Sequence, residues 1–252
     1  MVDFSLKDKI ALITGASRGI GEAIALTLAE YGAHCILVSR KIDALKSVED
    51  KITAKGGKAD SMACHMGEIK QIEKLIIDIR DRFGKLNILI NNAATNPHFG
   101  SLLSADEGMW DKTHEVNLRG PFFLIQKAVP LMEASGGGAI VNVASINGIR
   151  PSPTQGIYSI TKAAVIMMTK AYARELAPKK IRVNALLPGL TKTKFAGALF
   201  ENESIYTESI KVTPMGRAAQ PEEMAGAVLY LVSEASSYTT GACLICDGGR
   251  LI

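Results

Sequence analysis

A single α/β domain built on one doubly wound parallel sheet is the fold that this sequence predicts, and three observations support it. Short strand-like runs alternate with amphipathic helical segments along the whole chain, which is the pattern of a parallel sheet with helical crossovers. A glycine-rich turn joins the first run to the first helical segment. No linker, internal repeat or low-complexity segment divides residues 1–252. We expect about seven strands, with helices on both faces.

The composition is that of an ordinary globular protein. Apolar residues make up 47% and charged residues 21% of the chain, and the net charge is only +4. No run of like charges marks a nucleic-acid or membrane surface. No apolar stretch approaches the roughly 20 residues that span a bilayer, and the N-terminus lacks the apolar core of a signal peptide. We therefore expect a cytoplasmic protein without nucleic-acid or membrane partners.

The cysteines and histidines predict neither a redox centre nor a metal site. Cys243 and Cys246 form a C-x-x-C pair, but the pair lies in a predicted strand, whose alternation sends the two thiols to opposite faces. Redox motifs of this form need a helix N-terminus after a strand. The four histidines show no ligand spacing, so we expect no metal.

The first half of the chain predicts four strands, each followed by a turn or a helix. The strands are expected at residues 9–14, 34–39, 58–63 and 86–90. A helix follows the glycine turn, a second spans 42–55 and a third spans 68–83. The third carries Ile72, Leu75 and Ile79 at the spacing of one buried stripe.

The second half continues the alternation and contains one irregular segment. Strands are expected at 139–144, 181–187 and 241–247, and helices at 110–131, up to about 177, and at 221–233. Glycines at 136–138 and Pro178 mark the ends of two of these helices. Residues 194–213 lack clean periodicity and contain Phe195, Phe200 and Tyr206, so we interpret them as a substrate lid.

The turn after the first strand has the context of a dinucleotide-binding fingerprint, because it joins a strand to a helix. Gly15 would allow the tight turn, Gly19 a close approach to a pyrophosphate, and Gly21 the packing of helix on strand. The helix N-terminus supplies N–H groups and positive potential for phosphates. This favours a Rossmann-like fold. The turn residues expected at the cofactor are Gly15, Ser17, Arg18, Gly19, Ile20 and Gly21.

The end of the second strand favours NADP(H) over NAD(H). An NAD enzyme places an acidic residue there for the ribose 2′-hydroxyl, but this chain has Ser39 and Arg40. A hydroxyl and a guanidinium suit a 2′-phosphate instead, and Arg18 of the glycine turn could reach the same phosphate.

The segment from Ser145 to Lys162 carries the candidate chemistry. Ser145 follows an apolar run, at the strand end where open α/β sheets bind ligands. Tyr158 and Lys162 are four residues apart in a helical segment, so they share one face. A nearby cation lowers the pKa of a phenol, so we expect Lys162 to make Tyr158 a better proton donor.

With its G-x-x-x-G-x-G turn and its Tyr158-x-x-x-Lys162 motif, the chain resembles the short-chain dehydrogenase/reductase family over essentially its whole length. The resemblance implies that Asn117, Ser145, Tyr158 and Lys162 are the catalytic residues, with Asn117 holding a water that relays protons through Lys162. It also implies a homotetramer. His65 departs from the family pattern, which usually has an aspartate contacting the adenine amine there.

The resemblance also assigns further cofactor contacts. Asn92, in a segment where Ala94 replaces a glycine of the family pattern, would support the sheet and the nicotinamide-side ribose, and Thr193 would hold the carboxamide. The contacts implied beyond the glycine turn and the second strand are His65, Met66, Asn92, Ala93, Tyr158, Lys162, Pro188, Gly189, Thr191 and Thr193.

The predicted activity is the reduction of a ketone, aldehyde or diketone by hydride transfer, with Tyr158 as general acid. The motifs are similar to the branch that reduces retinal, diketones and aromatic ketones. Three alternatives stay open: a 3-oxoacyl-(acyl-carrier-protein) reductase, a sugar, polyol or steroid alcohol dehydrogenase, and a nucleotide sensor without catalysis. The last is disfavoured because Tyr158 and Lys162 are both present.

Overall fold

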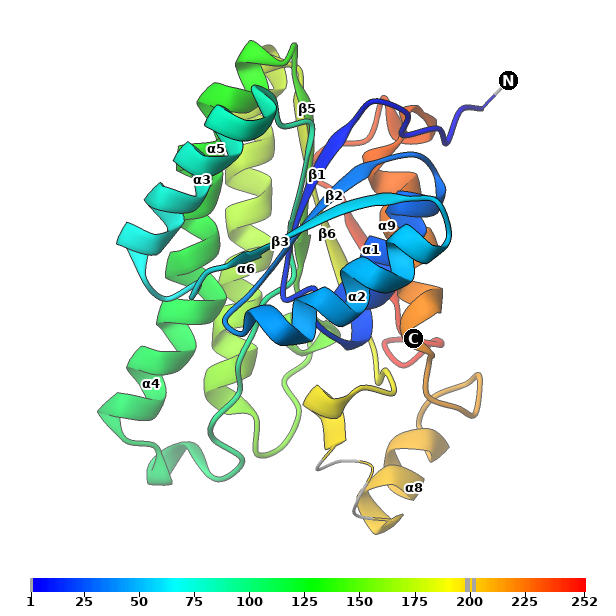
Figure 1. The fold of residues 1–252 in the computed structure, drawn as a ribbon. Coiled ribbons are helices and arrows are strands. Elements are labelled where there is room, and N and C mark those ends of the chain that lie inside the picture. Colours follow the sequence, from blue (N-terminus) through cyan, green and yellow to red (C-terminus); the bar gives the residue numbers. More distant parts are fainter. Residues whose placement is uncertain (1, 198–199, 201–202) are drawn as a thin grey trace.

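Seven parallel strands form one sheet in the order β3-β2-β1-β4-β5-β6-β7. The computed structural model describes residues 2–197, 200 and 203–252 (Figure 1). The chain starts at β1 in the middle, runs to one edge, and returns to build the other half from β4, which is a doubly wound topology. The strands are β1 (Ile10–Thr14), β2 (His34–Ser39), β3 (Lys58–Ala63), β4 (Ile88–Asn91), β5 (Gly138–Val143), β6 (Ile181–Pro188) and β7 (Cys243–Cys246). The predicted fold class is confirmed.

Helices cover both faces of the sheet (Figure 1). One face carries α1 (Gly19–Glu30), α2 (Ile42–Ala54) and α9 (Pro221–Val232), and the other carries α3 (Ile69–Phe83), α5 (Gly120–Ala134) and α6 (Gly156–Leu176). Successive strand residues point to opposite faces, so the apolar strands contribute side chains to two separate hydrophobic cores, one on each face of the sheet. No helix of the described residues is long and apolar enough to cross a membrane.

The two thiols of the C-x-x-C pair lie on opposite faces of β7, as predicted. Cys243 packs against the core on one side of the sheet, and Cys246 packs against the core on the other. Both are free thiols. The strand alternation therefore separates them.

The helix predicted at residues 110–131 is interrupted, which corrects the prediction. The helix α4 (Glu107–His114) passes into a π-helical turn at Glu115–Arg119, and α5 begins only at Gly120. Such turns insert one extra residue into a helix and are frequent at functional sites. This one contains Asn117.

The segment predicted as a lid contains more regular structure than its sequence suggested. A 3₁₀ turn at Lys194–Ala196 is followed by the helix α8 (Glu203–Lys211), while residues 198–199 and 201–202 of this segment lie outside the described residues. The ring of Phe195 lies 5.7 Å from that of Tyr158, centroid to centroid. The start of the segment therefore lies against the predicted catalytic tyrosine.

Candidate active site

The carboxyl ends of the strands open into a cavity of about 920 Å³. Loops at this end of a parallel sheet are where such folds bind ligands. The cavity brings together every predicted site residue except Asn117. Those that line it are Gly15, Ser17, Arg18, Gly19, Ile20, Gly21, Ser39, Arg40, His65, Met66, Asn92, Ala93, Ser145, Tyr158, Lys162, Pro188, Gly189, Thr191 and Thr193.

Two positions of the glycine turn require glycine. Gly15 has a φ of +67°, which favours glycine, and a Cβ on Gly21 would lie 2.3 Å from the Gly15 carbonyl oxygen. Asn92 fixes the turn from the end of β4, because its Nδ2 donates to the Thr14 carbonyl at 2.9 Å and to that of Gly15 at 3.2 Å. The first turn of α1 also has no side-chain cap. Its N–H groups are free to bind a phosphate, so the turn fits a dinucleotide.

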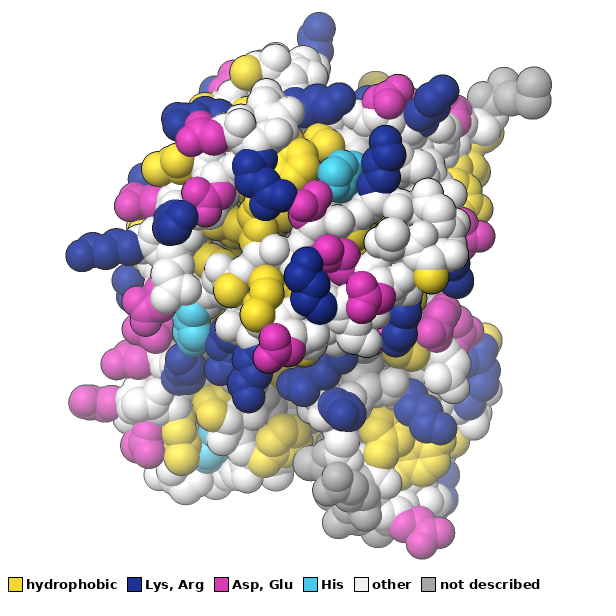
Figure 2. All heavy atoms as spheres, in the orientation of Figure 1, with side chains coloured by type: hydrophobic (Ala, Val, Ile, Leu, Met, Phe, Trp, Pro, Cys, Tyr) yellow, Lys and Arg dark blue, Asp and Glu magenta, His cyan; other side chains and the backbone are white. Residues whose placement is uncertain are grey.

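Cations line the part of the cavity beside the end of β2, where the adenosine of a bound dinucleotide would lie. Arg18 and Arg40 both line it, and neither forms an ion pair within the described residues. Figure 2 shows Lys and Arg side chains gathered across this face, below α2. The Ser39 hydroxyl donates to the Lys41 carbonyl at 3.0 Å, so only its oxygen is left for a ligand. A negatively charged group fits here, and the guanidinium groups rather than Ser39 would bind it.

His65 occupies the position where the family pattern usually has an aspartate, and its surroundings disfavour the charged form of the imidazole. Its Nδ1 accepts from the Gly67 N–H at 3.0 Å, and its Nε2 lies 3.2 Å from the Lys112 ammonium. Burial lowers the pKa of His65, and the positive charges of Lys112 and Arg40 lower it further. The ring therefore differs from an aspartate in both charge and hydrogen bonding.

Ser145, Tyr158 and Lys162 meet at the carboxyl end of β5. Ser145 Oγ accepts from the Asn147 N–H at 3.1 Å, and the Ser145 side chain acts on the pKa of Tyr158 as a hydrogen-bonding neighbour. Lys162 Nζ donates to the Val143 carbonyl at 2.8 Å and lies 5.4 Å from the centroid of the Tyr158 ring. The i, i+4 spacing on α6 produces this arrangement.

Burial, not the neighbouring amine, dominates the acidity of Tyr158. Burial raises the pKa of Tyr158, and the hydrogen bond with Ser145 lowers it only in part. Burial also lowers the pKa of Lys162 to about 7. The predicted lowering of the Tyr158 pKa by Lys162 is therefore wrong in direction, because burial raises the pKa of Tyr158 and opposes charge on the neighbouring amine as well.

Asn117 lies behind the cavity wall rather than in it. Its side chain accepts from the Thr95 N–H at 2.8 Å and donates to the Thr95 carbonyl at 2.9 Å and to Thr161 Oγ1 at 3.2 Å. Thr161 lies on α6 between Tyr158 and Lys162, so Asn117 joins the loop after β4 to the helix that carries both. Lys162 Nζ donates to the Val143 carbonyl instead, so no hydrogen bond joins the Asn117 side chain to Lys162 among the described residues.

Sequence reasoning missed several residues that line the same cavity. Gln155, one helical turn before Tyr158, is the clearest of them, and that spacing was the signal that could have found it. Lys112, Asn147 and Ser152 also line the cavity. Within residues 2–197, 200 and 203–252, no group of three or more His, Cys, Asp or Glu side chains could hold a metal ion.

A parallel sheet of this order, with a glycine turn at its first crossover, defines a Rossmann-fold protein of the dinucleotide-binding class. A family model described as enoyl-(acyl carrier protein) reductase matches residues 15–250. "Dehydrogenase/reductase SDR family member 4" of Pongo abelii is 40% identical over 97% of this chain and 88% of its own length. The chain belongs to the short-chain dehydrogenase/reductase family of oxidoreductases.

Two solved structures show how closely the fold follows that family. A gluconate 5-dehydrogenase from Burkholderia cenocepacia J2315, in complex with NADP and tartrate, superposes with a TM-score of 0.95 at 33% identity, covering 99% of this chain and 98% of that one. A 3-oxoacyl (acyl-carrier-protein) reductase from Agrobacterium tumefaciens C58 with NADP bound gives 0.91 at 35% identity, covering 98% and 95%. These relatives differ in substrate, so their similarity leaves the substrate of this chain open.

Proposed function

We propose that this protein is an NADP(H)-dependent reductase of small carbonyl compounds, acting on a ketone, aldehyde or diketone. One observation carries the proposal: Ser145, Tyr158 and Lys162 line the same cavity as the glycine turn. A nucleotide bound on the turn would therefore reach toward the three groups. General acid catalysis needs such a group within hydrogen-bond reach of the reacting oxygen.

The roles follow from the contacts of each side chain. When bound, the reduced nicotinamide supplies the hydride. The Tyr158 hydroxyl donates the proton to the carbonyl oxygen, and Ser145 hydrogen-bonds the same oxygen. Because burial keeps Tyr158 protonated, it enters the reaction in the form that donates. Lys162 holds the ribose hydroxyls, and Asn117 completes the set by fixing α6 against the loop after β4.

NADP(H) is the cofactor that the adenosine end supports best. Arg18 and Arg40 line the cavity at the end of β2, where Ser39 stands in place of an acidic residue. Arginine forks match phosphate oxygens better than hydroxyls. Solved relatives with NADP bound have the same fold.

The remaining assignments belong to the same proposal. Pro188 and Gly189 would cap the nicotinamide, Thr191 and Thr193 would line its carboxamide side, and residues 194–213 would form the lid of a single 1–252 domain. Thr193 Oγ1 accepts from the Ala196 N–H at 3.3 Å, so it also ties the start of the lid. A homotetramer and a cytoplasmic location complete the proposal.

The test is NADPH and NADH consumption with a panel of aromatic ketones, diketones and aldehydes, alongside fluorescence titration of each cofactor. We expect turnover with NADPH, and a higher kcat/KM for NADPH than for NADH. Equal use of both cofactors would contradict the NADP assignment. Tight NADPH binding with no turnover of any substrate would instead favour a nucleotide sensor.

The second candidate is a 3-oxoacyl-(acyl-carrier-protein) reductase, which the similarity to a solved enzyme of that name favours. An acidic carrier protein needs a basic surface at the mouth of the pocket, and Lys194 and Arg250 both line this cavity. An acetoacetyl thioester in the same panel separates the two functions. Selective turnover of the thioester would replace the general reductase. Oxidation of a sugar acid such as gluconate would point to the dehydrogenases instead.

A further inference from the structure

Gln155 lies at the start of α6, one turn before Tyr158, and its side chain does not cap the helix. Its backbone is held firmly, because the Ser159 N–H and the Ser159 hydroxyl both donate to the Gln155 carbonyl, at 2.9 and 2.8 Å. Gln155 directly precedes the helix that carries Tyr158, and the two residues line the same cavity.

A buried polar network orients that amide. Ser152 Oγ donates to Asn147 Oδ1 at 2.8 Å, and Asn147 Nδ2 donates to Gln155 Oε1 at 3.2 Å. The backbone N–H of Asn147 donates to Ser145 Oγ, so the network ends on the serine beside Tyr158. Gln155, Asn147 and Ser145 are all 8–9% exposed. The Asn147 contact uses the Gln155 oxygen, which leaves Nε2 directed elsewhere.

The Gln155 Nε2 group has no hydrogen-bond partner within the described part of the chain, although more than nine-tenths of the residue is buried. It is also absent from the fully enclosed polar atoms that lack partners. Since Gln155 lines the cavity, its free amide hydrogens are open to the cavity. A donor that faces the cavity can bind water, and a ligand that displaces this water without offering an acceptor leaves the donor unpaired at a cost in free energy.

We infer that Gln155 is a second substrate-contacting residue, which donates from Nε2 to an oxygen that the substrate carries beside the carbonyl being reduced. The inference rests on the proposed function, in which Tyr158 and Ser145 hold the reacting oxygen. Gln155 must then bind a different oxygen, one or two carbons away. The site selects dicarbonyl compounds and keto esters over ketones with a single oxygen, because a buried donor disfavours a substrate that leaves it unpaired.

The test uses a matched pair of substrates, acetylbenzoyl and propiophenone, which differ only by the second carbonyl group. Wild type, Gln155→Met and Gln155→Glu are assayed with NADPH. The glutamate variant keeps an oxygen for the Asn147 amide but exchanges the Nε2 donor for a carboxylate oxygen, which also adds a negative charge. Gln126→Met, at an exposed position of α5, is the control. Ethyl acetoacetate is the second arm, which places the second oxygen two carbons away. The Tm and NADPH titration of each variant show that it is folded.

Gln155→Met should lose about tenfold in kcat/KM for acetylbenzoyl, the size of one neutral hydrogen bond, and should stay within about twofold of wild type for propiophenone. Gln155→Glu should lose at least as much for acetylbenzoyl, because its carboxylate oxygen repels the second oxygen of the substrate. A comparable loss with ethyl acetoacetate alone would also support the donor role and assign the keto esters. Equal losses with all three substrates, or no loss, would overturn the inference while leaving the proposed function intact. A wild type that reduces none of them would sink the proposed function, and the inference with it.

Discussion

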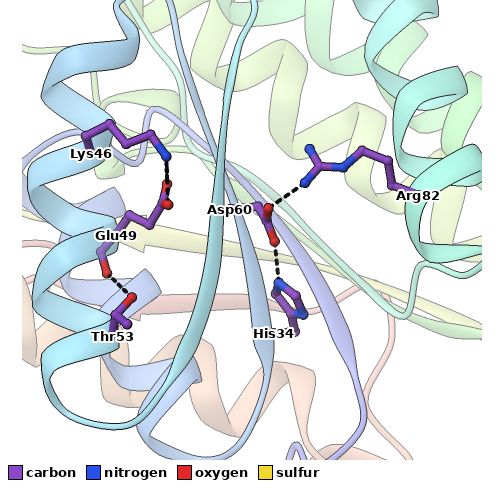
Figure 3. A network of polar contacts seen from close by, with 6 residues as sticks. All are labelled: His34, Lys46, Glu49, Thr53, Asp60 and Arg82. Carbon is purple, nitrogen blue, oxygen red and sulfur yellow. Dashed lines mark hydrogen bonds and ion pairs between the residues drawn. The ribbon is translucent and has the colours of Figure 1, made fainter.

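The polar cluster at the carboxyl end of β5 and the cluster at the β2–β3 edge of the sheet both contain a cationic side chain, but they lie in opposite surroundings. At the edge, His34 and Arg82 both reach Asp60, as Figure 3 shows, and the His34 Nε2–Asp60 Oδ2 distance is 2.6 Å. These side chains are 26–49% exposed. At β5, Lys162 and Tyr158 are 3% and 8% exposed, and no described carboxylate pairs with Lys162.

The comparison distinguishes partly exposed charges, which stabilise the folded state slightly, from a buried charge, which destabilises it. Exposed pairs such as His34–Asp60 typically contribute about 0–1 kcal/mol. A buried amine without a counter-charge is destabilising, and here it shows in the lowered pKa of Lys162. Folding alone would favour an apolar residue at that position. Strongly perturbed groups in a cavity are therefore candidates for function.

The largest effect should come from removing the proposed proton donor. Tyr158→Phe keeps the ring and removes the hydroxyl whose pKa Ser145 lowers. We expect kcat to fall by about 10²–10⁴-fold, with NADPH binding nearly unchanged. The rate of carbonyl reduction with NADPH measures kcat, and a fluorescence titration measures NADPH binding. Tyr31→Phe, at a residue 43% exposed, should behave like wild type. More than a tenth of the wild-type activity in Tyr158→Phe would remove the tyrosine from the chemistry.

The sequence was sufficient to predict what depends on local pattern. The strand–helix alternation, the glycine turn and the Tyr158–Lys162 spacing are all readable within about ten residues, and they placed the sheet and most of the cavity wall. The π-helical turn was not readable, because it depends on Asn117 meeting Thr95 and Thr161. Such contacts between distant segments leave no mark in helical periodicity.

The pKa directions were out of reach for the same reason. Spacing predicts that Lys162 and Tyr158 are neighbours, but it says nothing about how deeply the pair is buried. Burial opposes charge on both groups, and it reversed the expected effect on Tyr158. Gln155 was missed because its free amide depends on the Asn147 side chain, which the 3₁₀ turn after Ser145 presents to it.

Removing the Asn117 side chain tests whether the buried cluster is held by its hydrogen bonds. Asn117→Ala removes a side chain that is 1% exposed and leaves the partly buried Thr95 N–H and carbonyl without their partner. Each unpaired group costs about 1–3 kcal/mol, so we expect a loss of about 2–5 kcal/mol in urea unfolding. Thr161→Val removes only one of the three contacts and should cost about 1 kcal/mol. Equal losses in the two variants would show that Asn117 does not hold the loop.

The pH dependence of stability tests the burial of Lys162. Its folded-state pKa of about 7 lies below the ordinary 10.5, so above pH ~7 the unfolded chain binds more protons and stability rises with pH. Between about pH 7 and pH 9, wild type should gain up to about 1.4 kcal/mol per pH unit relative to Lys162→Met. Cys35 and Cys64 also have raised pKa values, but they change the pH dependence of stability only near and above pH 9, the ordinary pKa of a thiol.

Unfolding curves collected across that pH window measure this gain. Lys170→Met, on the exposed side of the same helix, should follow wild type in parallel. If the difference in the free energy of unfolding between wild type and Lys162→Met stayed constant with pH, the amine would be solvated. The two clusters would then not differ in the burial of their charges.

The smallest effect should come from the edge cluster. Asp60→Asn removes the negative charge that His34 and Arg82 share, but both partners can return to water because they are partly exposed. We expect a loss below about 1 kcal/mol, and one that shrinks as salt screens the pairs. Urea unfolding at low and high ionic strength measures it. A salt-independent loss as large as that of Asn117→Ala would mean that solvent exposure does not set the strength of polar clusters in this protein, since the two sites differ most in that property.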